Sequence, residues 1–177
     1  MTGTRWVALL RGINVGRARQ VGMPRLAEVL TAAGYGDVRT HLRSGNVLLT
    51  SPEGEAELAA DLGRVIREEF GFAVPVVLRT GAELAAVVER DPLGGSVTDP
   101  SRYSVTFLPV APEPAKVGAL PPPDGGNYAV AGRELYLWLP EGMARSPMGT
   151  WPWDRLLGVA GTNRNWNTVR ALAEMAA

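Results

Sequence analysis

The sequence predicts an α+β fold: a ferredoxin-like β-α-β-β-α-β subdomain over residues 1–80, packed against a smaller α+β subdomain over residues 81–177. Two observations support this prediction. Short apolar or alternating runs, typical of strands, are separated by stretches with apolar residues three and four positions apart, which are typical of helices. Glycine and proline stand at the ends of most of these segments. The 177 residues are enough for one compact chain with two small subdomains.

Six elements are predicted in the first half. The apolar run 5–11 is typical of a strand that is buried on both faces, and Pro24 suits the first position of a helix that Gly34 ends. A Ser44-Gly45 turn joins two strands into a hairpin. In order, we expect a strand at 5–11, a helix from Pro24 to Gly34, strands at 38–43 and 46–50, a helix from Ser51 to Gly71 and a strand at 74–79.

The second half is less regular, and the sequence shows no internal repeat. Thr80 and Glu83 have the spacing of a capping box, which predicts a short helix. Six prolines in residues 109–126 predict an extended connection. The remaining elements that we expect are a strand at 103–108, a hairpin at 127–139 and helices near 150–157 and 166–176.

Composition excludes several classes of site. With no cysteine and only one histidine, the chain has no disulfide, no thiol nucleophile and no multi-histidine metal centre, so we expect no metal and no cofactor. Lys+Arg and Asp+Glu both number 18, which disfavours a wholly basic nucleic-acid binder. No apolar run approaches the ~20 residues of a membrane span, and the N-terminal residues do not resemble a signal peptide. We therefore expect a cytoplasmic protein without a membrane partner.

The loop from Arg11 to Gly22 is the first candidate for function. It contains Arg11, Arg17 and Arg19, and residues 1–27 hold five arginines and no acidic residue. A glycine-containing loop before a helix N-terminus can present N–H groups to a phosphate or carboxylate. The alternative is a mobile, solvated loop whose glycines serve only to turn the chain.

Catalytic groups are harder to identify. His41 has no partner that would motivate a role in acid–base catalysis, and no serine occupies a strand-turn-helix elbow, so we expect a binding protein rather than an enzyme. Trp166 belongs to a helical apolar stripe and is interpreted as core. Arg164 is predicted in the first turn of that helix, where the dipole disfavours a cation, so its partner would be a carboxylate or a ligand.

Four motifs resemble one known family: residues 8–16 (ALLRGINVG), 44–47 (SGNV), 137–142 (LWLPEG) and 164–168 (RNWNT). In this order and over about residues 5–172, the chain is similar to the bacterial family called domain of unknown function 1697. The resemblance implies an α+β fold with a ferredoxin-like first part, and it implies no activity. The chain departs from the family pattern at Arg43, where Gln is common, and at Asn163, where Thr is usual.

Topology brings the first two motifs together, because the loop after the first strand and the turn after the second leave the same end of a ferredoxin-like sheet. We predict that these motifs and the last one meet in a polar cleft between the subdomains. Such a cleft would bind an anionic ligand, either a nucleotide or a single-stranded nucleic acid. Two alternatives stay open: a structural or partner-binding protein whose polar motifs seal the interface, and an enzyme acting on a small phosphorylated or carboxylated substrate. The predicted ligand-binding residues are Arg11, Asn14, Arg17, Arg19, Ser44, Asn46, Arg164 and Asn165.

Overall fold

The computed structural model describes residues 2–177 and divides the chain into two compact units. One unit comprises the chain up to Ala85 together with Leu172–Ala177, and the other comprises Ala86–Ala171. The division falls inside two helices, α3 (Gly81–Arg90) and α6 (Trp166–Met175). The final residues therefore belong with the first unit, which the sequence pattern did not indicate.

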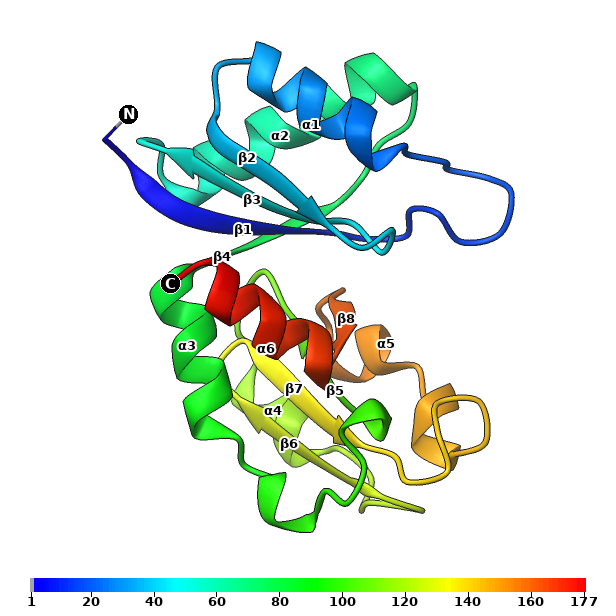
Figure 1. Ribbon diagram of the computed structural model, residues 1–177. Helices are drawn as coiled ribbons and strands as arrows, with labels where there is room; N and C mark the ends of the chain where they lie inside the picture. Colours follow the sequence, from blue (N-terminus) through cyan, green and yellow to red (C-terminus); the bar gives the residue numbers. More distant parts are fainter. Residues whose placement is uncertain (1) are drawn as a thin grey trace. The chain divides into compact units, whose positions relative to one another are not determined.

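The first unit is ferredoxin-like, as predicted. Its four strands form an antiparallel sheet in the order β2-β3-β1-β4, and its two long helices cover one face of that sheet (Figure 1). The elements are β1 (Thr4–Leu10), α1 (Met23–Ala32), β2 (Gly36–His41), β3 (Asn46–Ser51), α2 (Glu55–Phe70) and β4 (Val76–Thr80).

Alternation along the strands builds the core of this unit. Trp6 and Ala8 on β1 point to the same face as Leu78 on β4, because side chains two positions apart in a strand share a face. The apolar stripes of the two helices cover that face, Leu26 and Leu30 from α1 and Leu58, Leu62 and Ile66 from α2. All of these side chains are buried, and the face is closed to solvent.

The second unit repeats the connectivity of the first. Its antiparallel sheet has the order β6-β7-β5-β8, which matches the order of the first sheet when each strand is numbered within its own unit. Its helices are much shorter, since α4 and α5 have five residues each whereas α1 has 10 and α2 has 16. The elements are β5 (Tyr103–Phe107), α4 (Pro114–Gly118), β6 (Asn127–Ala131), β7 (Glu134–Trp138), α5 (Trp153–Leu157) and β8 (Thr162–Asn165).

The strand registers relate the two units position by position. Arg79 on β4 pairs with Val7 on β1, and Arg164 on β8 pairs with Val105 on β5. Both arginines are buried, both donate Nη1 to the carbonyl of the preceding residue, and both lie two residues before a helix. The chain is therefore a structural repeat, although its sequence shows none.

This register corrects the prediction for Arg164. The residue lies in β8 and not in the first turn of a helix, because α6 begins only at Trp166. Asn165 caps the helix by accepting a hydrogen bond from the backbone N–H of Asn167 at 2.9 Å.

Two smaller predictions are confirmed. Thr80 and Glu83 form a reciprocal capping box, with N-to-oxygen distances of 3.1 and 2.8 Å. Trp166 is core, 6% exposed, with its ring centroid 4.7 Å from that of Tyr103. The proline-rich connection differs from its prediction in one respect, because it contains the short helix α4.

Candidate functional site

In the first unit, the β1–α1 loop lies beside the β2–β3 turn, as the topology predicts. The backbone N–H of Leu10 donates to the Gly45 carbonyl at 2.8 Å. Gly45 has φ +93°, and a Cβ there would lie 2.6 Å from Ile13 Cδ1. Glycine is therefore required where the turn meets the loop.

The asparagines of these motifs hold the backbone in place. Asn14 donates its amide to the carbonyls of Val21 and Arg43 at 2.9 and 2.8 Å, and its Oδ1 accepts from the Val21 N–H at 2.8 Å. Asn46, which is buried, donates to the His41 carbonyl at 2.7 Å and to Ser44 Oγ at 3.0 Å. These contacts have a structural role. Ligand binding by Asn14, Ser44 and Asn46 stays a prediction.

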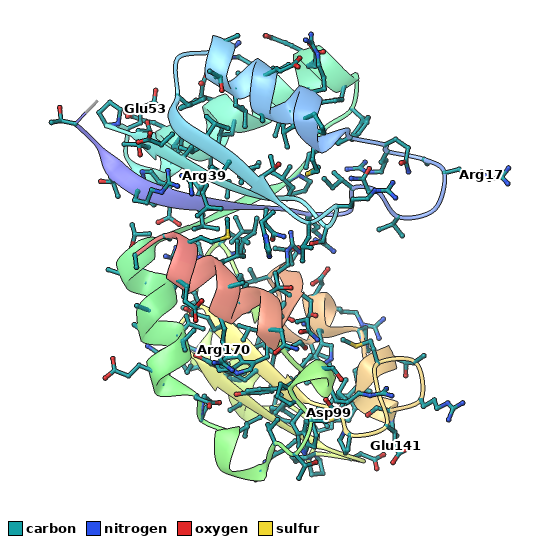
Figure 2. The ribbon with its side chains drawn as sticks, in the orientation of Figure 1. Arg17, Arg39, Glu53, Asp99, Glu141 and Arg170 are labelled. Atoms are coloured by element: carbon teal, nitrogen blue, oxygen red, sulfur yellow. The ribbon has the colours of Figure 1, made fainter. Side chains whose placement is uncertain are left out.

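The three arginines of the loop have different surroundings. Arg19 is tied to the backbone through the carbonyls of Gly12 and Ala73, and its guanidinium lies 5.0 Å from the centroid of the Phe72 ring. Arg11 is half-buried. Arg17 is exposed and points away from the loop (Figure 2). Arg17 thus presents its guanidinium to solvent.

Arg164 is buried in the second unit. Its guanidinium donates to Thr162 Oγ1 at 2.7 Å and to the Asn163 carbonyl at 2.9 Å. Burial lowers the pKa of this guanidinium to about 10, so the side chain is still a cation at neutral pH.

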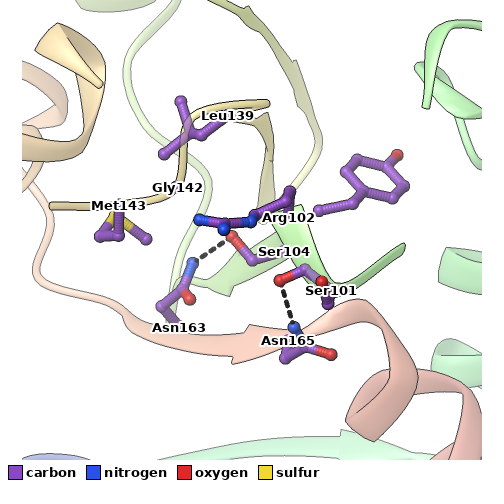
Figure 3. Close-up of a pocket in the computed structure, with 9 residues that line it drawn as sticks. Ser101, Arg102, Ser104, Leu139, Gly142, Met143, Asn163 and Asn165 are labelled. Atoms are coloured by element: carbon purple, nitrogen blue, oxygen red, sulfur yellow. Dashed lines mark hydrogen bonds between the residues drawn. The ribbon is translucent and has the colours of Figure 1, made fainter. Parts of the chain in front are cut away.

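A cavity lined by both polar and apolar side chains lies in the second unit, with a volume of about 370 Å³ (Figure 3). Among the residues predicted from the sequence, Asn165 lines it. A second cavity of about 490 Å³ shares Arg102, Gly142 and Met143 with it. We call the two together the Arg102 groove. Its lining residues are Ser101, Arg102, Tyr103, Ser104, Leu139, Pro140, Glu141, Gly142, Met143, Ala144, Arg145, Asn163 and Asn165.

Gly142 allows the position of Arg102. Gly142 has φ +85°, and a Cβ built on it would lie 1.9 Å from Arg102 Nη1. Only glycine permits the guanidinium to lie directly against the backbone at this point. The Leu-Trp-Leu-Pro-Glu-Gly motif therefore ends on the residue that positions the cation of the groove.

One wall of the groove is a hydrogen-bonded polar surface. Asn163 Nδ2 donates to Ser104 Oγ at 3.0 Å and to Thr106 Oγ1 at 2.9 Å. Asn165 Nδ2 donates to the Ser101 carbonyl at 2.9 Å. An amide carries an oxygen acceptor and two N–H donors, so Asn163 retains its Oδ1 and Asn165 retains one N–H for a further partner.

The repeat explains why a groove forms here. Aligning Arg164 with Arg79 places Ser104, Thr106 and Asn163 at the positions that Trp6, Ala8 and Leu78 occupy in the first unit. There, α2 covers the equivalent face with apolar side chains. In the second unit α5 has five residues, and its buried Leu157 packs against the apolar cluster that contains Leu135 and Leu137 of β7. The β5–β8 side of this face is polar: the exposed Asn163 covers the buried hydroxyls of Ser104 and Thr106.

The charges of the groove favour an anion at its inner part. The residues that line the first cavity include Arg102 and no acidic residue, whereas Glu141 and Arg145 line the second. Asp99 interacts electrostatically with Arg102. Hydrogen bonds from Ser101, with a smaller contribution from Arg102, lower the pKa of the Asp99 carboxyl. Arg102 is exposed and can turn toward a ligand.

Sequence reasoning missed Arg102, Ser104 and Met143. Gly142 is the last residue of the Leu-Trp-Leu-Pro-Glu-Gly motif, so the sequence did draw attention to it. Arg102 stands alone before a strand, and nothing in the local pattern separates it from any other exposed arginine. Ser104 and Thr106 alternate with apolar residues in a strand that is otherwise apolar. Buried hydroxyl groups need hydrogen-bond partners, so this pattern could have indicated a polar surface beside the strand.

Residues 2–177 lack two further classes of feature. Within this range, no helix has both the length and the apolar character required to cross a bilayer. The same residues contain no group of three or more His, Cys, Asp or Glu side chains placed to hold a metal ion.

Comparison with known proteins gives a family and a fold neighbour. Conserved bacterial protein SP0830 from Streptococcus pneumoniae has a structure similar to this one, with a TM-score of 0.76 and 25% sequence identity, over 99% of this chain and 100% of that one. No curated protein matches. A model of the family described as "Protein of unknown function (DUF1697)" matches residues 3–136. Because that match spans well over half of the sequence, the chain belongs to the DUF1697 family.

Proposed function

We propose that this protein binds an anionic small molecule, such as a nucleotide, in the Arg102 groove of the second unit. The observation that carries this proposal is the placement of the Arg102 guanidinium against Gly142, at the edge of a cavity with no acidic residue in its lining. A planar guanidinium in such a place can bind a phosphate or carboxylate through two parallel hydrogen bonds.

The rest of the groove suits a ligand that is more than an ion. Asn163 and Asn165 offer an acceptor and a donor beside the cation, and Leu139 and Met143 supply apolar surface. The cavity of about 370 Å³ lies in the size range of small-molecule sites. A nucleotide carries all three kinds of group: an anion, a polar edge and a flat apolar face.

Isothermal titration calorimetry with AMP, UMP and inorganic phosphate tests the proposal. We expect at least one nucleotide to bind, and Arg102→Ala to weaken that binding about tenfold or more, since a hydrogen bond to a charged group is worth about 1.5–3 kcal/mol. Arg170→Ala is the matched control, because Arg170 is an exposed arginine of the same unit outside the groove.

Three results would each contradict a different part of this proposal. If Arg102→Ala and Arg170→Ala bind the nucleotide equally well, the groove is not the site. If a labelled oligothymidine binds and no mononucleotide does, the ligand is a single-stranded nucleic acid and the small-molecule assignment is wrong. If neither binds at low salt, where anion contacts are strongest, the anion-binding proposal fails.

A further inference from the structure

The first unit separates its charges along the strand direction. β1 runs antiparallel to β3, so Thr4 lies opposite Ser51 at one end and Leu9 lies opposite Asn46 at the other. The first end continues into Glu53, Glu55 and Glu57. The second end continues into the loop that carries Arg17 and the turn that carries Arg43, and Figure 2 shows Glu53 and Arg17 at opposite ends of the unit.

The basic end also exposes aliphatic side chains. Val15 in the β1–α1 loop is 74% exposed, and Leu42 in the β2–β3 turn is 54% exposed. Each is adjacent in sequence to a residue that joins the two segments, because Asn14 donates to the carbonyl of Arg43. We call this region, consisting of Val15, Arg17, Leu42 and Arg43, the tip surface.

The tip surface is held in one shape at an energetic cost. Asn14, Arg19 and Leu42 all have positive φ, of 54°, 55° and 62°. A left-handed conformation is unfavourable for a branched apolar residue such as leucine, and a conformation of this kind persists only where the surroundings enforce it. Hydrogen bonds from the side chains of Asn14, Arg19 and Arg43 tie these segments together here. A surface organised before binding loses less entropy when a partner arrives.

The chemistry of this surface fits an acidic protein segment better than a nucleic acid. Proteins that bind single strands stack the bases on aromatic side chains, and the tip surface contains none. Apolar side chains surrounded by arginines are instead typical of protein interfaces, where aliphatic anchors enter pockets and arginine is enriched. Residues 38–52 contain no acidic residue that would repel such a segment.

We propose that the tip surface binds an acidic segment of a partner protein, with apolar residues of that segment packed against Val15 and Leu42 and its carboxylates paired with Arg17 and Arg43. This interaction is independent of the Arg102 groove, which lies in the other unit.

Fluorescence anisotropy with a labelled peptide of repeating Glu-Leu-Glu-Asp units tests this proposal. We expect saturable, salt-sensitive binding and no binding of the Lys-Leu-Lys-Lys counterpart. Val15→Ser combined with Leu42→Asn should weaken binding about tenfold. Asparagine tolerates positive φ, so this variant removes the apolar anchor without adding backbone strain. Val110→Ser is the control, because Val110 is 58% exposed and belongs to the other unit.

Three results would overturn the proposal: no peptide binding at low salt, equal binding by the double variant and the Val110→Ser control, or an oligothymidine that displaces the peptide and binds the double variant at full strength. Arg102→Ala should leave peptide binding unchanged. That variant separates the tip surface from the nucleotide site, so either proposal can fail while the other stands.

Discussion

The two units share one connectivity and differ in the helices that cover the sheet. In the first unit, α1 and α2 together close one face over Trp6, Ala8 and Leu78. In the second, the five-residue helices α4 and α5 pack beside β6 and β7, and the positions equivalent to those three residues are Ser104, Thr106 and Asn163. A shorter covering helix and polar residues beneath it thus accompany the groove of the second unit, where the first unit has a core.

The comparison also shows what the repeat preserves. Arg79 and Arg164 are buried at the same register position, two residues before a helix, and both units cap that helix with the residue between. The last strand of each sheet, β4 or β8, therefore leads into its helix in the same way in both units. The face of the sheet that carries Leu78 in the first unit and Asn163 in the second differs, because it forms a core in one and a groove in the other.

Truncating the side chains at two equivalent positions should destabilise the protein by different amounts. Leu78→Ala removes a side chain that is 1% exposed beneath two helices, and we expect it to lower the free energy of unfolding by about 2–5 kcal/mol. Asn163→Ala, at the equivalent position of an open face, should cost about 1 kcal/mol from its hydrogen bonds. Urea unfolding of both variants measures the difference. Equal losses would show that the second face is packed as tightly as the first.

Gly142→Ala should displace the Arg102 guanidinium from its position in the groove. The new Cβ would occupy the place of Arg102 Nη1, so we expect nucleotide affinity to fall about tenfold along with a modest loss of stability. Gly132→Ala is a matched control: Gly132 also has positive φ, at 59°, but its Cβ would approach an atom outside its immediate neighbours only at 3.8 Å. If both variants bind the nucleotide equally, the Gly142–Arg102 contact does not position the site.

A contact that weakens in acid should help to hold helix α2 in place. Asp61 on α2 accepts a hydrogen bond from the Tyr35 hydroxyl, and this bond, with Arg64 contributing further, lowers the pKa of the Asp61 carboxyl below its usual 3.8. A depressed carboxyl pKa stabilises the fold above the unfolded-state pKa, and that contribution is lost as the pH falls through the folded-state pKa.

Asp61→Asn should therefore lower stability slightly at neutral pH, and this loss should shrink at an acid pH at which the Asp61 carboxyl is protonated in the folded protein. The Asp61 side chain is 31% exposed, so the expected difference is only a few tenths of a kcal/mol. Urea unfolding of the protein and the variant at both pH values checks the sign. A difference that grows in acid would contradict this assignment.

Local pattern was sufficient for the first unit because its strands alternate cleanly and its helices are long, amphipathic and bounded by Pro24 and Gly71. It failed to show the repeat, since the polar residues Ser104 and Asn163 replace the apolar residues that mark the same strands in the first unit. Of the residues that line the groove, the sequence had singled out Asn165. The position of Arg102 depends on a contact with Gly142 across forty residues of chain, which no local spacing encodes.

Backbone N–H chemical shifts, recorded by NMR during titration with AMP, test the central claim most directly. The account predicts that the largest shifts fall on residues 101–104, 139–145 and 163–165, and that Arg102→Ala removes them. Shifts that center on the β1–α1 loop of the first unit, or shifts that persist in Arg102→Ala, would contradict it.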